Sequence, residues 1–303
     1  MRKEFFFPSK DGITQIHAVE WVPEKEVTAV LQMCHGMVEH IMRYDRFAAF
    51  LVEKGIYVVG NDHLGHGKSV LEDNRRGYFC YTDGNEVLIE DIHKLRSITS
   101  EKYPDKPYFM LGHSMGSFLL RQYLGLYGAG LRGAVIMGTG DQPEAMLGAG
   151  RLACRLIAMV KGWKHRSQFL YNLSIGAYEK QMGPGWLSAN PGNIKKYNED
   201  PMSGFKFTVN AYFHMFTGMQ RMNRLEKECR APKELPLYFV AGKEDPVGDC
   251  GKGVEAVSKR YLDSGYSDVS IKLYEHDRHE ILHEKDKYTV FEDIFVWIEA
   301  KCS

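Results

Sequence analysis

The chain has 303 residues, of which 44% are hydrophobic and 26% are charged. This composition is typical of a globular protein with a core and excludes the disordered and fibrous classes. Lysine and arginine number 39, as do aspartate and glutamate, so the formal net charge is +0 and no nucleic-acid partner is predicted.

Cysteine usage and hydropathy point to the reducing interior of the cell. The six cysteines are scattered without a CxxC pair, which predicts free thiols. The apolar run near the N-terminus is three phenylalanines, shorter than a signal peptide needs, and no later run approaches a membrane span. We therefore expect a cytoplasmic protein.

Short apolar runs follow a predicted hairpin over the first twenty residues and alternate with helical patterns. Continuous runs of four to seven apolar residues are typical of parallel strands that are covered on both faces. The predicted strands are residues 27–33, 56–59, 108–111, 134–137, 237–241 and 269–273. The alternation predicts an α/β fold with a mostly parallel sheet and helices on both faces.

Two apolar stripes mark helices within this alternation. Leu88, Ile92 and Leu95 recur at i, i+4 and i+7, and the pattern ends before Pro104. A similar stripe lies near the C-terminus, at Val290, Ile294, Trp297 and Ile298.

The alternation is interrupted over residues 141–230, which are rich in methionine and aromatic residues and contain no convincing βα unit. We expect a helical cap, inserted over the strand ends where open α/β sheets bind ligands. The sheet domain is then formed by residues 1–140 and 231–303. The alternative is a helical excursion that only thickens the core.

A candidate nucleophile lies between a predicted strand and a predicted helix, in the sequence Gly112-His113-Ser114-Met115-Gly116. In this G-x-S-x-G context the serine occupies a tight turn, and small residues on both sides let the strand and the helix approach. The backbone N–H of Met115 lies at the helix start, where it can stabilise an oxyanion. The alternative is a plain glycine-rich turn.

A serine nucleophile needs a base and an orienting acid, which follow in the order Asp or Glu, then His. Asp245 lies just after one predicted strand and is favoured over Asp249, with Glu244 as the rival. After the next strand the residues alone leave three histidines open: His276, His279 and His283.

The first central strand ends in Cys34-His35-Gly36-Met37. A His-Gly pair at this position suits a second oxyanion donor, the N–H of Met37, since Gly36 lets the backbone bend toward the substrate. The alternative is a simple turn at the strand end.

These residues together resemble the serine α/β-hydrolases of the monoacylglycerol lipase and lysophospholipase group, bacterial type. The similarity rests on five motifs: His35-Gly36-Met37-Val38-Glu39-His40 with Arg43-Tyr44, Asn61 to Ser69, Gly112 to Gly116, Gly242-x-x-Asp245-Pro246, and Tyr274 to Glu280. One departure is Ser117, where the family often has a further glycine.

The resemblance implies an α/β-hydrolase fold, a mobile helical cap and a cofactor-independent serine esterase without a metal. In the family a Tyr-x-x-x-x-His pattern carries the catalytic histidine, which is His279 here. Ser114 is then the nucleophile and Asp245 the acid, with the Met37 and Met115 amides as the oxyanion hole. The implied substrate is a monoacylglycerol, a lysophospholipid or a similar single-chain ester.

Substrate contacts are expected from the loop residues His35 and Gly36 and from a roof of apolar cap residues, which could also be plain core. The roof candidates are Phe205, Phe207, Tyr212, Phe213, Met215, Phe216 and Met219. An apolar cap would also allow transient contact with a membrane or micelle. The sequence makes no prediction of oligomeric state.

Other functions remain as alternatives. Within the same fold these are a short-chain carboxylesterase of broad specificity, an aminopeptidase or amidase, and a ligand receptor without catalysis. The segment His279-Glu280-Ile281-Leu282-His283 also spells H-E-x-x-H, the zinc motif of metalloproteases. We expect this overlap to be accidental, because few residues follow it to supply a further ligand.

Overall fold

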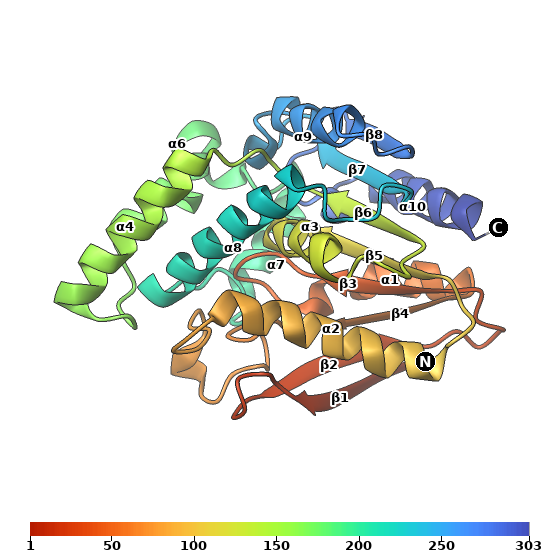
Figure 1. Cartoon of the computed structure of the whole chain (residues 1–303), viewed down its shortest axis with the longest axis horizontal. Helices are drawn as coiled ribbons and strands as arrows, with labels where there is room; N and C mark the ends of the chain where they lie inside the picture. Colours follow the sequence, from red (N-terminus) through yellow and green to blue (C-terminus); the bar gives the residue numbers. More distant parts are fainter. Residues whose placement is uncertain (303) are drawn as a thin grey trace.

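The computed structural model describes residues 1–302, which form one eight-stranded sheet with helices on both faces (Figure 1). The strands are β1 (Arg2–Pro8), β2 (Gln15–Trp21), β3 (Ala29–Cys34), β4 (Ile56–Asn61), β5 (Tyr108–His113), β6 (Gly133–Met137), β7 (Leu237–Gly242) and β8 (Val269–Tyr274). Every strand predicted from the sequence is present.

The sheet has the order β1-β2-β4-β3-β5-β6-β7-β8. The N-terminal hairpin β1–β2 is antiparallel and joins the sheet through an antiparallel pairing of β2 with β4. All remaining pairings are parallel. The carboxyl ends of the parallel strands therefore meet at one edge, where loops from distant parts of the sequence converge.

Burial of the strands follows their position in the sheet. Strands β3 to β7 are buried along their whole length, as expected from their continuous apolar runs. The prediction was wrong for β8, which is an edge strand with Ile271 and Lys272 exposed to solvent. A lysine at an open edge discourages pairing with another chain.

Residues 1–302 also form ten α-helices. They are α1 (Asp45–Glu53), α2 (Gly84–Lys102), α3 (Met115–Tyr127), α4 (Glu144–Lys161), α5 (Gln168–Leu173), α6 (Ile175–Met182), α7 (Pro191–Glu199), α8 (Val209–Lys227), α9 (Lys252–Asp263) and α10 (Lys287–Lys301). Among residues 1–302, no helix is long and apolar enough to cross a bilayer.

Alternate side chains of the central strands enter two different cores. On one face the strands pack against α1 and α10, through residues such as Phe47 and Ile294. On the other face they pack against α2, α3 and α9, through residues such as Ile92, Leu120 and Val257. The two predicted helical stripes thus lie on opposite faces of the sheet.

The segment between β6 and β7 contains helices α4 to α8 and no strand within the described residues. Helix α8 packs along α3 and against α4, so α4 lies on the outside of the molecule (Figure 1). The division of the chain into a sheet domain and a cap of residues 141–230 stays a prediction.

Candidate active site

Ser114 occupies the turn between β5 and α3 with backbone angles φ 53° and ψ −121°. This conformation is strained for a residue with a side chain, and such strain concentrates at functional sites. The Ser114 amide is held by a hydrogen bond to the Met137 carbonyl at 3.0 Å. The turn therefore presents the hydroxyl beyond the end of the sheet.

The two glycines of G-x-S-x-G are required by close backbone approach. A Cβ atom at Gly112 would lie 2.3 Å from the Gly116 carbonyl oxygen, and one at Gly116 would lie 2.1 Å from the carbonyl oxygen of Cys34. Strand β5, helix α3 and the end of β3 are thus packed backbone to backbone. This packing brings the loop after β3 beside Ser114.

Two backbone amides near Ser114 are free to bind an anion. Neither the Met37 N–H nor the Met115 N–H donates to another residue between positions 1 and 302. The Met115 amide begins α3, where the helix dipole favours negative charge. Both residues line the cavity that contains Ser114.

An acid–base pair lies at the same edge of the sheet. The His279 Nδ1 atom is 2.9 Å from Asp245 Oδ2, and both side chains are almost fully buried. Asp245 Oδ1 also accepts a hydrogen bond from the Val247 amide at 2.9 Å. The carboxylate is therefore fixed on both of its oxygens, and the imidazole is oriented by it.

The rival residues occupy other positions. Glu244 faces His276 and Arg278 on the surface, and the His276 side chain is 91% exposed. Asp249 is exposed to solvent. His283 is half-buried, and desolvation lowers its pKa to about 4. Of the three histidines, only His279 contacts Asp245.

The H-E-x-x-H segment does not form the helix that a metalloprotease requires. Residues Ile281–His283 are a single 3₁₀ turn, so His279 and His283 do not share one face of an α-helix. His279 Nδ1 is also engaged by Asp245. Within the described part of the chain, no group of three or more His, Cys, Asp or Glu side chains is placed to hold a metal ion.

A cavity of about 120 Å³ connects these groups, and Ser114, His279, Met37 and Met115 all line it. The ring of Trp186 lies beside the His279 imidazole, with 5.5 Å between centroids. The other apolar lining residues come from the loop after β3, from α3, from the segment between β6 and β7, and from the loop after β7: Val38, Phe118, Leu173, Ile175, Tyr178, Leu187, Tyr197, Met215, Phe216, Met219 and Val247.

The proposed roof is only partly represented in this lining. Phe216, Met215 and Met219 line the cavity, whereas the other candidates, Phe205, Phe207, Tyr212 and Phe213, do not. Phe205 and Phe207 pack against the ring of His66 instead. The ring of Phe213 lies against Trp163. These side chains fill core, which was the alternative left open by the sequence.

The two candidate loop residues also differ in position. Gly36 lines the cavity, but the His35 side chain lies behind it, fully buried. The His63 amide donates to His35 Nε2 at 2.9 Å, and His35 Nδ1 is 2.8 Å from the Gly36 carbonyl oxygen. His35 therefore holds the loop that carries the Met37 amide rather than facing a ligand.

Several lining residues were missed by the sequence analysis. Leu173, Ile175, Tyr178 and Trp186 come from α5, α6 and the turn that follows α6. The sequence Trp186-Leu187-Ser188 was the available signal, because a tryptophan beside a turn is unusual for a surface segment.

A buried charged network also went unpredicted. Arg43 lies between Glu39 at 3.4 Å and Glu280 at 2.6 Å, and Glu39 Oε1 accepts from the Gly36 amide at 2.5 Å. Burial opposes ionisation of Glu39, but the His113 hydrogen bond and the Arg43 charge outweigh it and hold its pKa well below the usual range. The network thus links the loops that carry Met37 and His279.

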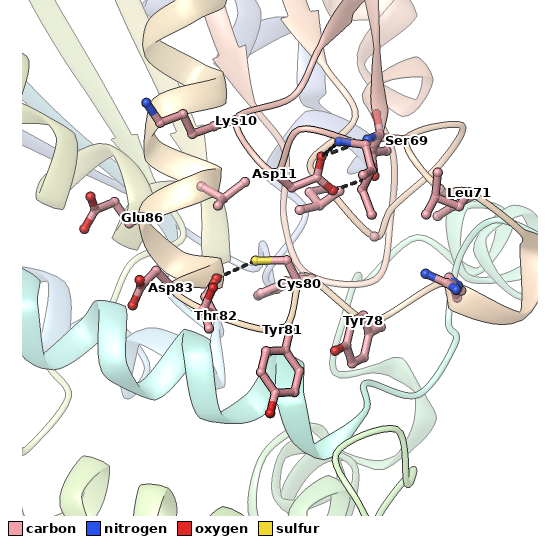
Figure 2. Close-up of a pocket in the computed structure, with 18 residues that line it drawn as sticks. Lys10, Asp11, Ser69, Leu71, Tyr78, Cys80, Tyr81, Thr82, Asp83 and Glu86 are labelled. Atoms are coloured by element: carbon pink, nitrogen blue, oxygen red, sulfur yellow. Dashed lines mark hydrogen bonds between the residues drawn. The ribbon is translucent and has the colours of Figure 1, made fainter.

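Cavity size does not identify this site. A larger cavity of about 460 Å³ lies between the β1–β2 turn and residues 64–87, and Figure 2 shows its lining. There the Thr14 amide of the same turn donates to Asp11 Oδ1, and the Cys80 thiol donates to the Thr82 carbonyl. None of its lining residues lines the cavity beside Ser114.

The chain is similar to known proteins over most of its length. Residues 25–286 match the family described as serine aminopeptidase, S33. The monoglyceride lipase of Mus musculus is 27% identical over 93% of this chain and 86% of its own. The monoacylglycerol lipase of Mycolicibacterium smegmatis is 26% identical over 98% of this chain and 97% of its own.

Solved structures extend the similarity to the whole fold. A thermostable carboxyl esterase from Bacillus coagulans in complex with glycerol superposes with a TM-score of 0.92, is 28% identical, and covers 100% of this chain and 99% of its own. A monoglyceride lipase variant from Saccharomyces cerevisiae has a TM-score of 0.78 at 21% identity, covering 99% and 95%, and shares the fold. The α/β-hydrolase fold predicted from the sequence is confirmed.

Proposed function

The chain belongs to the serine aminopeptidase S33 family of α/β-hydrolases, and on that premise we propose that it is a serine esterase that uses Ser114, His279 and Asp245. It hydrolyses carboxylic esters of monoacylglycerol-like substrates. The observation that carries the proposal is one small cavity that is lined by Ser114, by the Asp245-oriented His279, and by two residues whose amides donate to no residue from 1 to 302.

The choice of an ester over a peptide substrate rests on the relatives. The family description names an aminopeptidase, but the relatives that cover nearly the whole chain are named lipases of monoglycerides or monoacylglycerols. A carboxyl esterase shares the fold over the whole chain at 28% identity. An aminopeptidase also needs an anchor for a free amine, but the two carboxylates that line the cavity, Glu39 and Glu280, are already paired with Arg43.

Acylation begins with the Ser114 hydroxyl. Its oxygen attacks the acyl carbonyl carbon while its proton passes to His279 Nε2. Asp245 accepts the hydrogen bond from His279 Nδ1–H, which fixes the tautomer and stabilises the imidazolium that forms. The tetrahedral oxyanion is bound by the N–H groups of Met37 and Met115. His279 then returns the proton to the leaving alcohol, and the acyl-enzyme remains.

Deacylation repeats these steps with water. His279 takes a proton from water, the resulting hydroxide attacks the acyl-enzyme, and the same two amides bind the second oxyanion. The acid leaves as Ser114 regains its proton. The two half-reactions consume only the ester and water, so this mechanism uses no cofactor.

The first test is loss of the nucleophile. Ser114→Ala is expected to lower kcat on the order of 10⁶-fold, because the other triad members cannot act without the serine. A fluorophosphonate should label the natural chain and not the variant. Retention of most esterase activity by Ser114→Ala would refute the mechanism. Activity that is lost with EDTA and restored by zinc would instead support the metalloprotease alternative.

A second test measures the acyl preference. Each methylene buried in the cavity contributes about 0.8 kcal/mol, so kcat/KM on p-nitrophenyl esters should rise up to about fourfold per added carbon until the cavity is full. A maximum at acetate would favour the alternative of a short-chain carboxylesterase.

We further propose that α4 and α5 touch the lipid surface that supplies the substrate. Their exposed apolar side chains are Met146, Leu152, Leu156, Met159, Val160, Phe169 and Leu173. Residues 144–173 also carry five lysines or arginines and one acidic residue, in a chain with no net charge. An apolar helix face with basic flanks suits the interface of an anionic membrane. Leu173 also lines the cavity, which therefore opens on this face.

A further inference from the structure

A second, very small chamber lies behind the cavity, between α2, α3 and α8. Its volume is about 10 Å³, close to the minimum that holds one water-sized group. It is formed where α8 packs against both α2 and α3 (Figure 1). Gly218 of α8 makes room for it, because a Cβ there would lie 2.0 Å from the Asn85 carboxamide nitrogen.

The chamber contains a carboxamide without a protein partner. Gln122 of α3 is 1% exposed, and neither its Oε1 nor its Nε2 atom has a hydrogen-bond partner among residues 1–302. Asn85 of α2 also lines the chamber, and in that same range its side chain forms no hydrogen bond. A buried polar group without a partner is costly, so such a group in a folded protein calls for a ligand or another role.

The chamber adjoins the cavity beside Ser114, which the proposed function assigns to the acyl chain. Met115, Phe118, Met215 and Met219 line both spaces, and Met115 follows Ser114 directly. Three of these four are methionines, whose unbranched side chains change rotamer readily. A thin alkyl chain that enters beside Ser114 can therefore displace them and reach Gln122.

We propose that this chamber is a subsite for a hydroxyl group on the acyl chain, with Gln122 as the residue that selects it. This inference rests on the esterase function and narrows its substrate class to esters of hydroxylated acids. A hydroxyl group matches the volume of the chamber. It also donates to Oε1 and accepts from Nε2 of Gln122, which satisfies both atoms.

The lining argues against other polar groups. No residue that lines the chamber is charged, so a carboxylate or an amine would be buried without a counter-ion. A keto group would accept from Nε2 but leave Oε1 without a donor. An unsubstituted alkyl chain would leave both Gln122 atoms without a partner.

The test is a positional series of substrates. At the chain length that is hydrolysed best among plain p-nitrophenyl esters, the hydroxyl is moved one carbon at a time along the acyl chain. One position should give kcat/KM roughly 5- to 10-fold above the plain ester, the gain expected for one new buried hydrogen-bonded group. The other positions should fall below the plain ester, because their hydroxyl is buried in the apolar cavity.

Two variants show whether Gln122 is the cause. Gln122→Met keeps the side-chain volume and removes both polar atoms, so the ratio between the favoured hydroxy ester and the plain ester should fall to 1 or below. Leu119→Met changes an apolar wall of the same chamber and should keep the ratio above 1. A ratio that persists in Gln122→Met would overturn the assignment.

Failure of the subsite is distinguishable from failure of the esterase. If plain esters are cleaved but no hydroxyl position is favoured, the chamber holds solvent only and the inference is wrong while the esterase stands. If no ester is cleaved, calorimetric titration of the natural chain with a plain ester and with each hydroxy ester of the same chain length still measures the binding ratios. Equal affinities would then reject the subsite independently of catalysis.

Discussion

Replacing Asp245 by asparagine separates the charge of this side chain from its shape. In the natural chain the Val247 amide donates to Oδ1 and His279 Nδ1 donates to Oδ2, each at 2.9 Å. Asparagine has one oxygen acceptor and one NH₂ donor in place of these two acceptors. The variant can therefore satisfy only one of the two neighbours at a time.

Both arrangements of the asparagine impair the base. If its oxygen faces Val247, its NH₂ donates to His279 Nδ1, the ring proton moves to Nε2, and Nε2 can no longer accept the Ser114 proton. If its oxygen faces His279, the NH₂ faces the buried Val247 N–H, at a cost of about 1–3 kcal/mol. The productive tautomer is thus a minor species, and the imidazolium that forms lacks a counter-charge.

We expect kcat to fall on the order of 10⁴-fold in Asp245→Asn, or about 5 kcal/mol of transition-state stabilisation. The assay is steady-state hydrolysis of a p-nitrophenyl ester, with thermal unfolding to show that the fold is retained. Glu244→Gln and Asp249→Asn are matched controls on carboxylates of the same loop, of which Glu244 faces His276 and Arg278 and Asp249 is exposed, and both should stay within about twofold. An Asp245→Asn variant with more than about a tenth of the natural kcat would refute the reasoning.

Three further predictions follow from the packing, the buried histidines and the outer helix. Gly116→Ala should lower kcat about 10²-fold or more and reduce stability, because its Cβ would collide with the Cys34 carbonyl and displace the loop that carries Met37. Gly148→Ala is the control and should leave activity unchanged, because a Cβ at Gly148 would lie 3.7 Å from the Gln220 side chain, an ordinary contact distance. Burial lowers the pKa of His66 to about 3, so its contribution to stability is present above the unfolded value near 6.5 and is lost as pH falls from there toward 3. When the pH falls from 7 to 5, the free energy of unfolding measured in urea should therefore fall by about 2 kcal/mol less for His66→Phe than for the natural chain. An equal fall in the two proteins would contradict the prediction. The double variant Leu156→Glu/Met159→Glu should co-sediment less with phosphatidylglycerol vesicles, whereas Val296→Glu, on the exposed side of α10, should co-sediment like the natural chain. Equal co-sedimentation of the natural chain and both variants would exclude α4 as the contact.

The sequence by itself determined the parts of this protein that depend on neighbouring residues. Apolar runs located six of the eight strands, the other two form the hairpin predicted over the first twenty residues, and apolar stripes located α2 and α10. The glycines around Ser114 predicted the sharp turn that the backbone angles show. These features are local, since strand periodicity and turn chemistry are encoded within about ten residues.

The tertiary structure decided which distant residues meet. From the residues alone three histidines were open, and family resemblance singled out His279; the contact with Asp245 exists because β7 and β8 end side by side. Aromatic density could not distinguish Phe216 in the cavity from Phe207 in the core. Phe216 lies on α8 and Phe207 just before that helix begins, and only the packing of the surrounding elements decides which of them lines the cavity.

Gln122 is the clearest case of this division. Its sequence neighbours predict only a position on a helix, and a glutamine there is compatible with an exposed surface. It becomes a candidate ligand because α8 and α2 pack over it and remove its polar atoms from water without supplying partners. Burial of this kind is a property of three helices distant in the chain, and no local pattern in any one of them encodes it.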